Sequence, residues 1–294
     1  MSNIVWYVIL AVIGVGVSAY SIYNKRNIYK VSTLITFYLF AAGITWIGEF
    51  IVLGLFNSYA YKTGIFIDPW AQNLLGHLIL NTTLYPAISV VVAVYSLRFG
   101  GMCSITVIFL GLEYLFLKLG LYEQHWWRFY MTALTVLLLL IISKYWFAKL
   151  LRKPYGSTRM ITFYFIALLI IHTPAPILLL LGKQHYQTGL SERLFKDFYL
   201  SSIVFIFFYH LVLSFIVVLL TCVLKKWYWK AMPFIFPVIV QSIFAKTGIL
   251  RIDDGWKLIY TILIYEAFIA LFILLEKTTL KPDPDRACLR ERIE

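Results

Sequence analysis

Residues 199–224 read YLSSIVFIFFYHLVLSFIVVLLTCVL and contain no Asp, Glu, Lys or Arg. An apolar run of about 20 residues is long enough to cross the hydrocarbon core of a bilayer as an α-helix. A helix is also one of the few structures that satisfies its own backbone hydrogen bonds in lipid. This stretch therefore predicts a transmembrane helix.

The rest of the chain repeats this pattern. Hydrophobic residues make up 61% of the 294 residues, and charged residues only 14%, against roughly 25% in soluble domains. The charges gather in short clusters between apolar runs. These runs predict an all-α, polytopic transmembrane helix bundle with nine spans, at 4–23, 31–57, 77–97, 102–120, 130–148, 159–182, 199–224, 231–247 and 257–276.

Lys and Arg are distributed unequally between the two sides of this bundle. Seventeen of the 26 lie on the side that holds Lys25 and the polar tail 277–294. Because cytoplasmic loops carry the excess, we expect an outside N-terminus, a cytoplasmic tail and a location in the cell membrane. Val17-Ser18-Ala19 resembles a signal-peptide cleavage site, but no positive charge precedes the first run, so we expect an uncleaved helix.

Charge and cysteine content exclude several classes of protein. The net charge of +12 comes from residues at the ends of apolar runs, which predicts contact with the lipid bilayer and no binding of nucleic acid. Three cysteines without paired spacing predict neither a disulfide framework nor a zinc site. The sequence motifs for nucleotide loops, zinc-protease helices and serine-hydrolase elbows are lacking. We expect no metal and no cofactor, and the oligomeric state stays open.

A short pattern recurs where helices are expected to reach the outer face. A helix-capping Gly, a Lys that extends to the headgroups and a Trp at headgroup level would each suit that interface. Gly182-Lys183 is a weaker version. The spacing of about one helical hairpin favours duplication, although similar constraints at each helix end would also produce the pattern. The expected outer-interface anchors are Lys62, Gly64, Trp70, Lys118, Gly120, Trp126, Lys246, Gly248 and Trp256.

The stretch LEYLFLKLGLY at 112–122, followed by Trp126 and Trp127, resembles a stretch common in a family of small, uncharacterised polytopic membrane proteins of spore-forming Firmicutes. Gly255-Trp256 is similar to the family's Gly-Trp step into the next helix. A family member is about half this length, so the resemblance implies two tandem four-helix units.

These units would be a first unit, 31–150, and a second unit, 159–276, after a first helix and loop in 1–30. The sequence departs from the family pattern at His125-Trp126, where Gly-Trp is expected, and at Gln241, where Glu is expected. The family has no established activity, so the resemblance implies an architecture only.

Ionisable side chains inside spans are costly and usually face protein, a partner or water. Gln241 precedes Lys246 by the same spacing as Glu113 precedes Lys118, so a polar group recurs at one depth. A structural contact and a ligand or proton site are equally consistent with Glu113. The candidate polar site comprises Glu49, Glu113, Gln241, His172, His210 and Glu266.

His172 precedes Pro174 and Pro176, which are expected to break the helix near the middle of the membrane. His210 is expected at a similar depth in the next helix. The two histidines would form a hydrogen-bonded core pair, or hold a proton, a metal or a haem. Without further ligands the core pair is favoured.

Together these features favour a non-enzymatic membrane protein, a small-solute or ion transporter or a sensor, with its polar site between the two units. One alternative is a membrane-embedded enzyme that acts on a lipid or isoprenoid, with Glu49, Glu113 or the histidines as acid and base. Another is an envelope or sporulation scaffold. Units with an even number of spans would be parallel repeats about an axis along the membrane normal.

Overall fold

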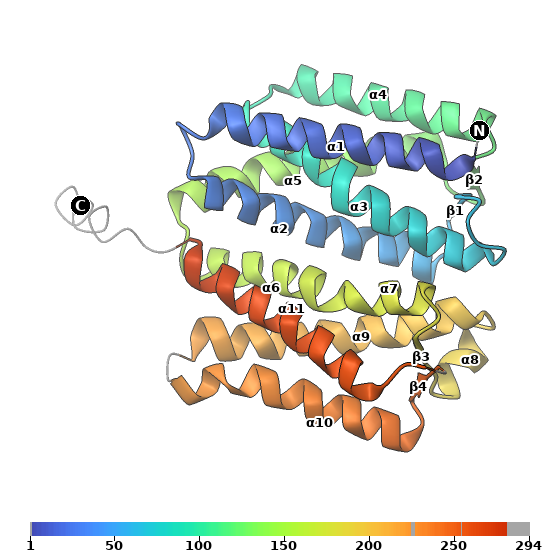
Figure 1. Ribbon diagram of the computed structural model, residues 1–294. Coiled ribbons are helices and arrows are strands. Elements are labelled where there is room, and N and C mark those ends of the chain that lie inside the picture. Colours follow the sequence, from blue (N-terminus) through green and yellow to red (C-terminus); the bar gives the residue numbers. More distant parts are fainter. Residues whose placement is uncertain (1, 225–226, 254, 281–294) are drawn as a thin grey trace.

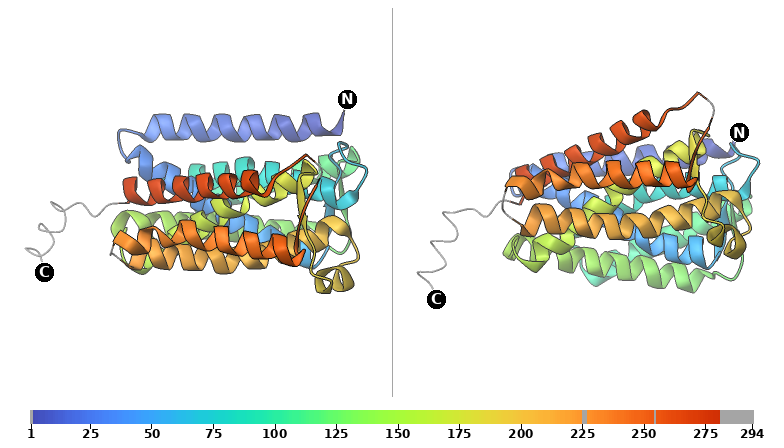
Figure 2. Two further views of the ribbon diagram at one scale, coloured as in Figure 1. Left: turned by 60° about the horizontal axis from the view of Figure 1, so that its bottom comes forward. Right: turned by 90° about the horizontal axis from the view of Figure 1, so that it is seen from below.

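The computed structural model describes residues 2–224, 227–253 and 255–280. Long helices lie side by side and nearly parallel (Figures 1 and 2). In chain order the elements are α1 (Asn3–Lys25), α2 (Val31–Glu49), η1 (Phe50–Leu55), β1 (Tyr59–Tyr61), α3 (Pro69–Val94), α4 (Phe99–Lys118), β2 (Tyr122–Gln124), α5 (Phe129–Arg152), α6 (Ser157–His172), α7 (Pro174–Leu180), β3 (Gln184–Tyr186), α8 (Leu190–Leu194), α9 (Phe198–Val218), η2 (Leu219–Val223), η3 (Trp227–Lys230), α10 (Met232–Thr247), β4 (Leu250–Ile252) and α11 (Leu258–Thr278).

Within the described ranges, eight helical segments are long and apolar enough to cross a membrane. They are α1, α2 with the π-helical η1, α3, α4, α5, α6 with α7, α9 with the π-helical η2, and α11. The ninth expected span is also apolar and helical but shorter, because α10 has 16 residues. The prediction of an all-α, multi-pass membrane protein is confirmed.

Several predicted boundaries were wrong. Helix α3 begins at Pro69 rather than at 77, because the Asp68 side chain accepts a hydrogen bond from the Ala71 N–H (2.9 Å) and Pro69 occupies the first helical position. Trp70 therefore lies in the first turn of a helix rather than in a loop. The helix before Pro174 ends at His172, as the two prolines predicted, and α7 continues in the same direction.

Two short antiparallel strand pairs at one end of the bundle were not expected from the sequence; each joins strands that are separated by two or more helices, and they are called the first and the second hairpin below. Strand β1 pairs antiparallel with β2, and β3 pairs with β4, in the same register: Tyr59 lies opposite Gln124, and Gln184 opposite Ile252. All four strands gather at the end where α1 begins (Figure 1). Strands of three residues carry too little periodicity to be read from a sequence.

The hairpins change the interpretation of the recurring glycines. Gly120, Gly182 and Gly248 adopt left-handed conformations (φ 68°, 60° and 76°) and directly follow helices that lead into a strand. Before β1 that conformation is adopted by Asn57 (φ 45°), whereas Gly64 follows the strand. Lys62 and Gly64 therefore do not end a helix, which corrects the alignment made from the sequence.

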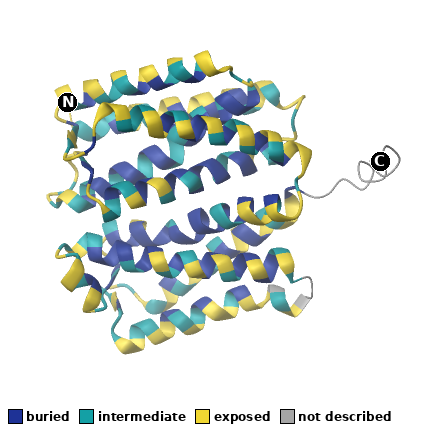
Figure 3. Cartoon of the chain, turned by 180° about the vertical axis from the view of Figure 1, so that it is seen from behind, coloured by how far each residue is buried: buried dark blue, intermediate teal, exposed yellow. Residues whose placement is uncertain are grey.

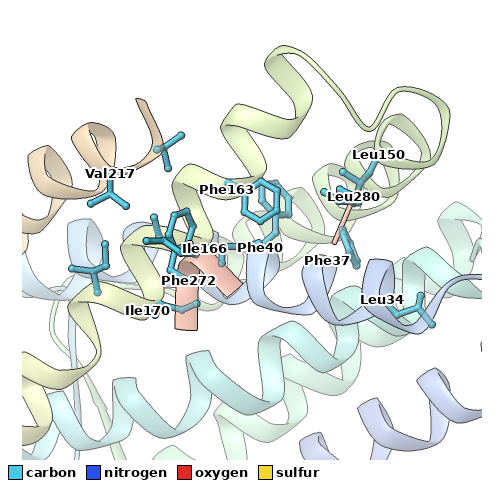
Figure 4. Close-up of a cluster of buried hydrophobic side chains, with 14 of the residues drawn as sticks. Leu34, Phe37, Phe40, Leu150, Phe163, Ile166, Ile170, Val217, Phe272 and Leu280 are labelled. Carbon is cyan, nitrogen blue, oxygen red and sulfur yellow. The ribbon is translucent and has the colours of Figure 1, made fainter. Parts of the chain in front are cut away.

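Burial distinguishes central from peripheral helices. In the segment α6–α7, 72% of the most apolar window is buried, against 22% in α4, and buried residues concentrate along the middle helices (Figure 3). One apolar core joins α2, α6, α9 and α11 through residues such as Phe40, Phe163, Val217 and Phe272 (Figure 4). At the centre, Gly43 of α2 lies so close to the Phe165 backbone of α6 that an added methyl group would overlap it.

Helix α1 begins at the hairpin end, and α11 ends at the opposite end (Figures 1 and 2). This arrangement is the one that an odd number of spans requires. Which end faces the cytoplasm stays a prediction from the positive charges. Cys103 and Cys222 belong to α4 and η2, at the end away from the hairpins, whereas Cys288 and the rest of 281–294 lie outside the described residues.

Candidate functional site

A cavity of about 310 Å³ lies in the first unit, where α2, α3, α4 and α5 meet the first hairpin. Two of the predicted site residues, Glu49 of α2 and Glu113 of α4, line it together. Gln241, another of the six residues of the candidate polar site, does not line it. Exposed Thr135 and Leu138 of α5 also line the cavity, which therefore reaches the outer surface of the bundle.

Glu49 is the last residue before the π-helical turn η1, at the point where the helix changes its winding. Such turns redirect side chains and occur often at functional sites. Its side chain is buried, and both carboxylate oxygens are bonded: Oε1 accepts from the Tyr61 hydroxyl, and Oε2 from Nδ2 of Asn81. These donors stabilise a carboxylate that would otherwise be costly inside a span.

Strand β1 positions Tyr61 for this contact. The backbone N–H of Tyr61 donates to Oδ1 of Asn73 on α3 (2.7 Å). The ring packs on the bare backbone of Gly76, where an added Cβ would lie 2.6 Å from it. The hairpin therefore closes the outer end of the cavity and fixes the hydroxyl that meets Glu49.

Glu113 is held less completely. Its Oε1 accepts a hydrogen bond from Nε2 of Gln124 in β2 (2.8 Å). Its Oε2 is buried and has no partner within hydrogen-bonding distance among the described residues, although the Thr132 hydroxyl lies nearby. A buried carboxylate oxygen without a donor carries the full cost of desolvation, so the Glu113 carboxylate is less well compensated than that of Glu49.

The hairpin tyrosines of the cavity are neutral donors. Burial raises the pKa of the Tyr59, Tyr61 and Tyr122 phenols, and the nearby carboxylates raise it further. The phenols therefore remain protonated at physiological pH.

A line of polar side chains leads from the cavity to the second unit. Nδ2 of Asn81 lies 3.2 Å from Nδ1 of His77, which in turn lies 3.9 Å from Oε2 of Glu49. The Trp46 ring packs edge-on against His77 and His172, with centroids 4.7 and 5.5 Å away.

A second, smaller cavity of about 40 Å³ lies along this line, between α2 and α3 on one side and α6 and α9 on the other. It is lined by Glu49, His77 and His172, among others, and at ~30 Å³ per molecule it has room for about one water. Glu49 thus borders both cavities. This small cavity lies between the two predicted units, where the sequence predicted a polar site.

His172 and His210 form the pair suggested by their depth. Their Nδ1 atoms lie 3.0 Å apart, so one ring donates and the other accepts, and Nε2 of His210 is buried without a partner. No group of three or more possible metal ligands was found among the described residues. Glu266, on α11, lines neither cavity, and its Oε1 is buried without a partner.

In the second unit, Gln241 accepts a hydrogen bond from the Tyr186 hydroxyl (3.2 Å). Gln184 of β3 accepts one from Thr261 of α11. These amide side chains therefore bond to neighbours within their own unit and carry no charge.

The expected outer anchors have varied roles at the hairpin end. Lys62 pairs with Glu123 (2.5 Å), and Lys118 lies over the Tyr114 ring, 4.8 Å from its centroid. Trp126 Nε1 donates to the Phe56 carbonyl (2.7 Å), and Trp256 Nε1 to Thr261 (3.0 Å). Trp70 packs in the apolar cluster of the first unit, and Lys246 lies in the last turn of α10, which ends at Thr247 and is followed by the left-handed Gly248.

Sequence reasoning missed His77, Asn81 and the hairpin tyrosines. His77 is the first residue of the expected span 77–97, and Asn81 lies inside that span. The one available signal was the alternation of Tyr59 and Tyr61 just before the Asp68-Pro69 helix start.

No family model, no curated protein and no solved structure matches the chain.

Proposed function

We propose that this multi-pass membrane protein is a small-solute transporter whose binding site is the cavity of the first unit. The observation that carries the proposal is the convergence of Glu49 and Glu113, from two different spans, on one cavity. Ionisable residues within spans are rare and costly, and they usually mark solute or proton pathways. A volume of about 310 Å³ falls at the lower end of the range for small-molecule sites.

Irregular helices near the site support movement of solute. The π-helical turn η1 follows Glu49 directly, and α6 gives way to α7 at Thr173, one residue beyond His172. Broken helices at membrane depth are typical of transporters, where they line the binding site. The unpartnered carboxylate oxygen of Glu113 lowers the stability of the fold. A protein that served only as a scaffold would gain nothing from it.

The proposal includes a duplicated architecture, in which α2–α5 correspond to α6–α11. Three matched features support it. Both hairpins share one register, with Lys62 N–H donating to the Leu121 carbonyl and Gln187 N–H to the Ile249 carbonyl. Asp68 and Asp197 cap α3 and α9 in the same way. Each side chain accepts a hydrogen bond from the backbone N–H three residues later, that of Ala71 (2.9 Å) or Leu200 (3.0 Å).

The third feature is a Trp–Thr hydrogen bond at the start of the last helix of each unit. It joins Trp127 to Thr132 (2.7 Å) and Trp256 to Thr261 (3.0 Å). Trp127, rather than Trp126, is then the counterpart of Trp256. In this correspondence Gln241 replaces Glu113, so the second unit lacks the carboxylate that points into the cavity of the first.

The test compares carboxylates within spans. Purified wild type and the variants Glu49→Gln, Glu113→Gln and Glu266→Gln are unfolded thermally with a panel of small cations, anions and neutral solutes. Solutes that bind are then offered to proteoliposomes. Because Glu266 lines neither cavity, its variant is the matched control.

We expect at least one solute to raise the Tm of wild type and Glu266→Gln, but not of Glu113→Gln, and to enter proteoliposomes. Binding without uptake contradicts transport and leaves a sensor. Chemical conversion of an added lipid or isoprenoid favours the enzyme alternative. A panel without any binding solute contradicts a binding site in the cavity.

A further inference from the structure

We propose that the cavity of the first unit selects a small organic cation, an ammonium with apolar substituents, in a cage of aromatic rings closed by Glu113. This inference rests on the proposed function, because it names the class of solute for the same cavity. It is carried by the charge of the lining, the arrangement of the rings, the unpartnered carboxylate oxygen and the bare backbone of Gly48.

The charge of the lining selects the sign of the ligand. Glu49 and Glu113 line the cavity, and no described Lys, Arg or His does so. The phenols of the hairpin are protonated and neutral. An anionic solute would therefore meet carboxylates without a compensating positive charge, which is strongly unfavourable in a medium of low dielectric.

Aromatic rings form a continuous wall around the space. The Tyr59 and Tyr122 centroids lie 5.1 Å apart, Tyr61 and Tyr122 5.8 Å apart, and Tyr59 and Trp127 5.7 Å apart, and all four rings line the cavity. A cation within about 6 Å of a ring centroid is attracted by the ring's electron-rich face, and aromatic cages recognise quaternary ammonium groups in this way.

The two carboxylates have different tasks. Both oxygens of Glu49 already accept hydrogen bonds, from Tyr61 and Asn81, so this residue holds the Tyr61 ring of the aromatic wall in place. Oε2 of Glu113 is covered by protein atoms without a hydrogen-bond partner among the described residues, and the Glu113 side chain lines the cavity, so a cation bound there would compensate this carboxylate. A charge-assisted contact to this carboxylate would offset the cost of leaving that oxygen unpaired.

Metal ions fit this lining poorly. Hard cations such as Mg²⁺ and Ca²⁺ require about six or more oxygen ligands, whereas here one carboxylate is saturated and most of the remaining lining is apolar. An organic ammonium is weakly hydrated and gains from apolar contact. At ~30 Å³ per heavy atom, as for liquid water, a cavity of about 310 Å³ holds about ten heavy atoms.

Gly48 gives direct control over this space. It lies one residue before Glu49 and lines the cavity, and a Cβ built there would meet nothing within 4 Å. Its helical backbone accepts any side chain without strain. Gly48 is exposed, and Gly48→Leu adds a side chain at the edge of the cavity while raising helix propensity. Gly16→Leu in α1, where an added Cβ also meets nothing within 4 Å, is the matched control outside the cavity.

The experiment measures binding to the purified full-length chain in lipid nanodiscs by titration calorimetry. The probes are benzyltrimethylammonium, choline, the neutral choline isostere 3,3-dimethyl-1-butanol and the anion 3,3-dimethylbutyrate. Each is titrated into wild type, Gly48→Leu, Gly16→Leu, Glu113→Gln, Tyr122→Phe and Tyr122→Leu. The thermal unfolding of each variant confirms that it is folded.

We expect both ammonium probes to bind at least tenfold more tightly than the isostere, and Glu113→Gln to reduce that preference at least tenfold. Gly48→Leu abolishes binding, and Gly16→Leu leaves it unchanged. Tyr122→Phe keeps the ring and therefore weakens binding less than Tyr122→Leu, which loses roughly 2- to 30-fold. If Glu113→Gln does not fold, the two Tyr122 variants decide alone.

The failures of the two proposals differ. If the isostere or the anion binds as tightly as choline and Gly48→Leu blocks it, the cavity is a solute site but the cation class is wrong. Equal binding by Tyr122→Phe and Tyr122→Leu also overturns the aromatic cage. If no probe binds, the cation class is rejected. If Gly48→Leu leaves binding intact, the cavity as the site of the proposed function is rejected as well.

Discussion

Tyr61 and Tyr186 occupy matching positions in the two strand pairs, but their hydroxyls bond to helices that do not correspond, α2 and α10. Each is the last residue of the first strand of its hairpin. Each backbone N–H donates to a polar side chain on the next long helix, Asn73 (2.7 Å) or Ser202 (2.8 Å). Each hydroxyl then donates to an oxygen inside a span, but that oxygen belongs to the carboxylate of Glu49 in one half and to the amide of Gln241 in the other.

This difference predicts unequal costs for removing the two hydroxyls. Tyr61→Phe leaves the buried Glu49 carboxylate one donor short and should lower the free energy of unfolding by ~1–3 kcal/mol. Tyr186→Phe removes a bond to a neutral amide and should cost ~0.5–1.5 kcal/mol. Thermal and denaturant-induced unfolding in detergent measure both variants. An equal or larger cost at Tyr186 would contradict the assignment.

The crossing of α2 and α6 should be intolerant of added volume. Gly43→Ala places a methyl group against the Phe165 backbone, which forces the two helices apart and should cost ~1–3 kcal/mol. Gly16→Ala meets nothing within 4 Å and should be neutral or stabilise by up to ~1 kcal/mol. The unfolding temperatures of both variants test this, and matching temperatures would show that the helices do not approach closely at Gly43.

Asp197 should make the protein more stable as the pH falls toward the ordinary carboxyl range. Burial raises its pKa above the usual 3.8, and the charge of Asp68 raises it further. The folded state therefore binds a proton at a higher pH than the unfolded state, so stability rises as the pH falls through the raised value and levels off near 3.8.

Asp197→Asn keeps a helix-capping oxygen for Leu200 and removes this dependence. We expect it to raise stability at neutral pH by less than about 1 kcal/mol, since the site is partly exposed to solvent. The measurement is Tm against pH for both proteins. Parallel curves would mean that Asp197 titrates as an ordinary carboxyl group.

Much of the fold follows from the sequence, because a bilayer imposes strong constraints on composition. Every expected span is helical, since long apolar runs such as 199–224 have no other stable form in lipid. The break after His172 was also predicted, because the prolines that follow lack the N–H that would continue the hydrogen bonds of the helix. The predicted start of α3 was wrong, because it depends on one capping side chain, Asp68, and the pattern of apolar residues gives no information about caps.

The candidate site was only half predictable. Glu49 and Glu113 stand out because carboxylates inside spans are costly, and the structure brings them to one cavity. Their separation from Gln241 depends on which helices pack together, which no single span reveals. Tyr61 was missed because its role comes from a three-residue strand whose partner is far away in the sequence.

The sidedness of the bundle predicts how its cysteines react. Cys103 and Cys222 lie at the end away from the hairpins, and Cys288 follows the last span in the sequence. The excess of Lys and Arg predicts that this side faces the cytoplasm. All three should therefore resist a membrane-impermeant maleimide in intact cells and become more reactive after lysis.

Ile67→Cys is the positive control, because Ile67 is fully exposed between β1 and α3 at the opposite end. It should react without lysis. Because lipid also shields Cys103 and Cys222, the decisive residue is Cys288. Its labelling in intact cells would reverse the predicted orientation.

The two hairpins should close equally well when bridged by disulfides. Ala60 lies opposite Glu123, and His185 opposite Arg251, at the middle position of each strand pair. Cross-strand neighbours have Cβ atoms about 4.5–5.5 Å apart, and a disulfide requires Cα atoms within about 7 Å. In a chain without its native cysteines, Ala60→Cys with Glu123→Cys and His185→Cys with Arg251→Cys should both oxidise readily.

The control combines Ala60→Cys with Arg251→Cys, two positions from different hairpins that do not pair, and should stay reduced. Mass spectrometry of proteolytic fragments before and after reduction identifies each bridge. Closure of both hairpins to a similar extent supports the correspondence of 31–150 with 159–276, because it requires the same register at both sites. If only the first hairpin closes, the second unit does not share that register. The recurring glycines would then be separate solutions to ending a helix at the outer interface.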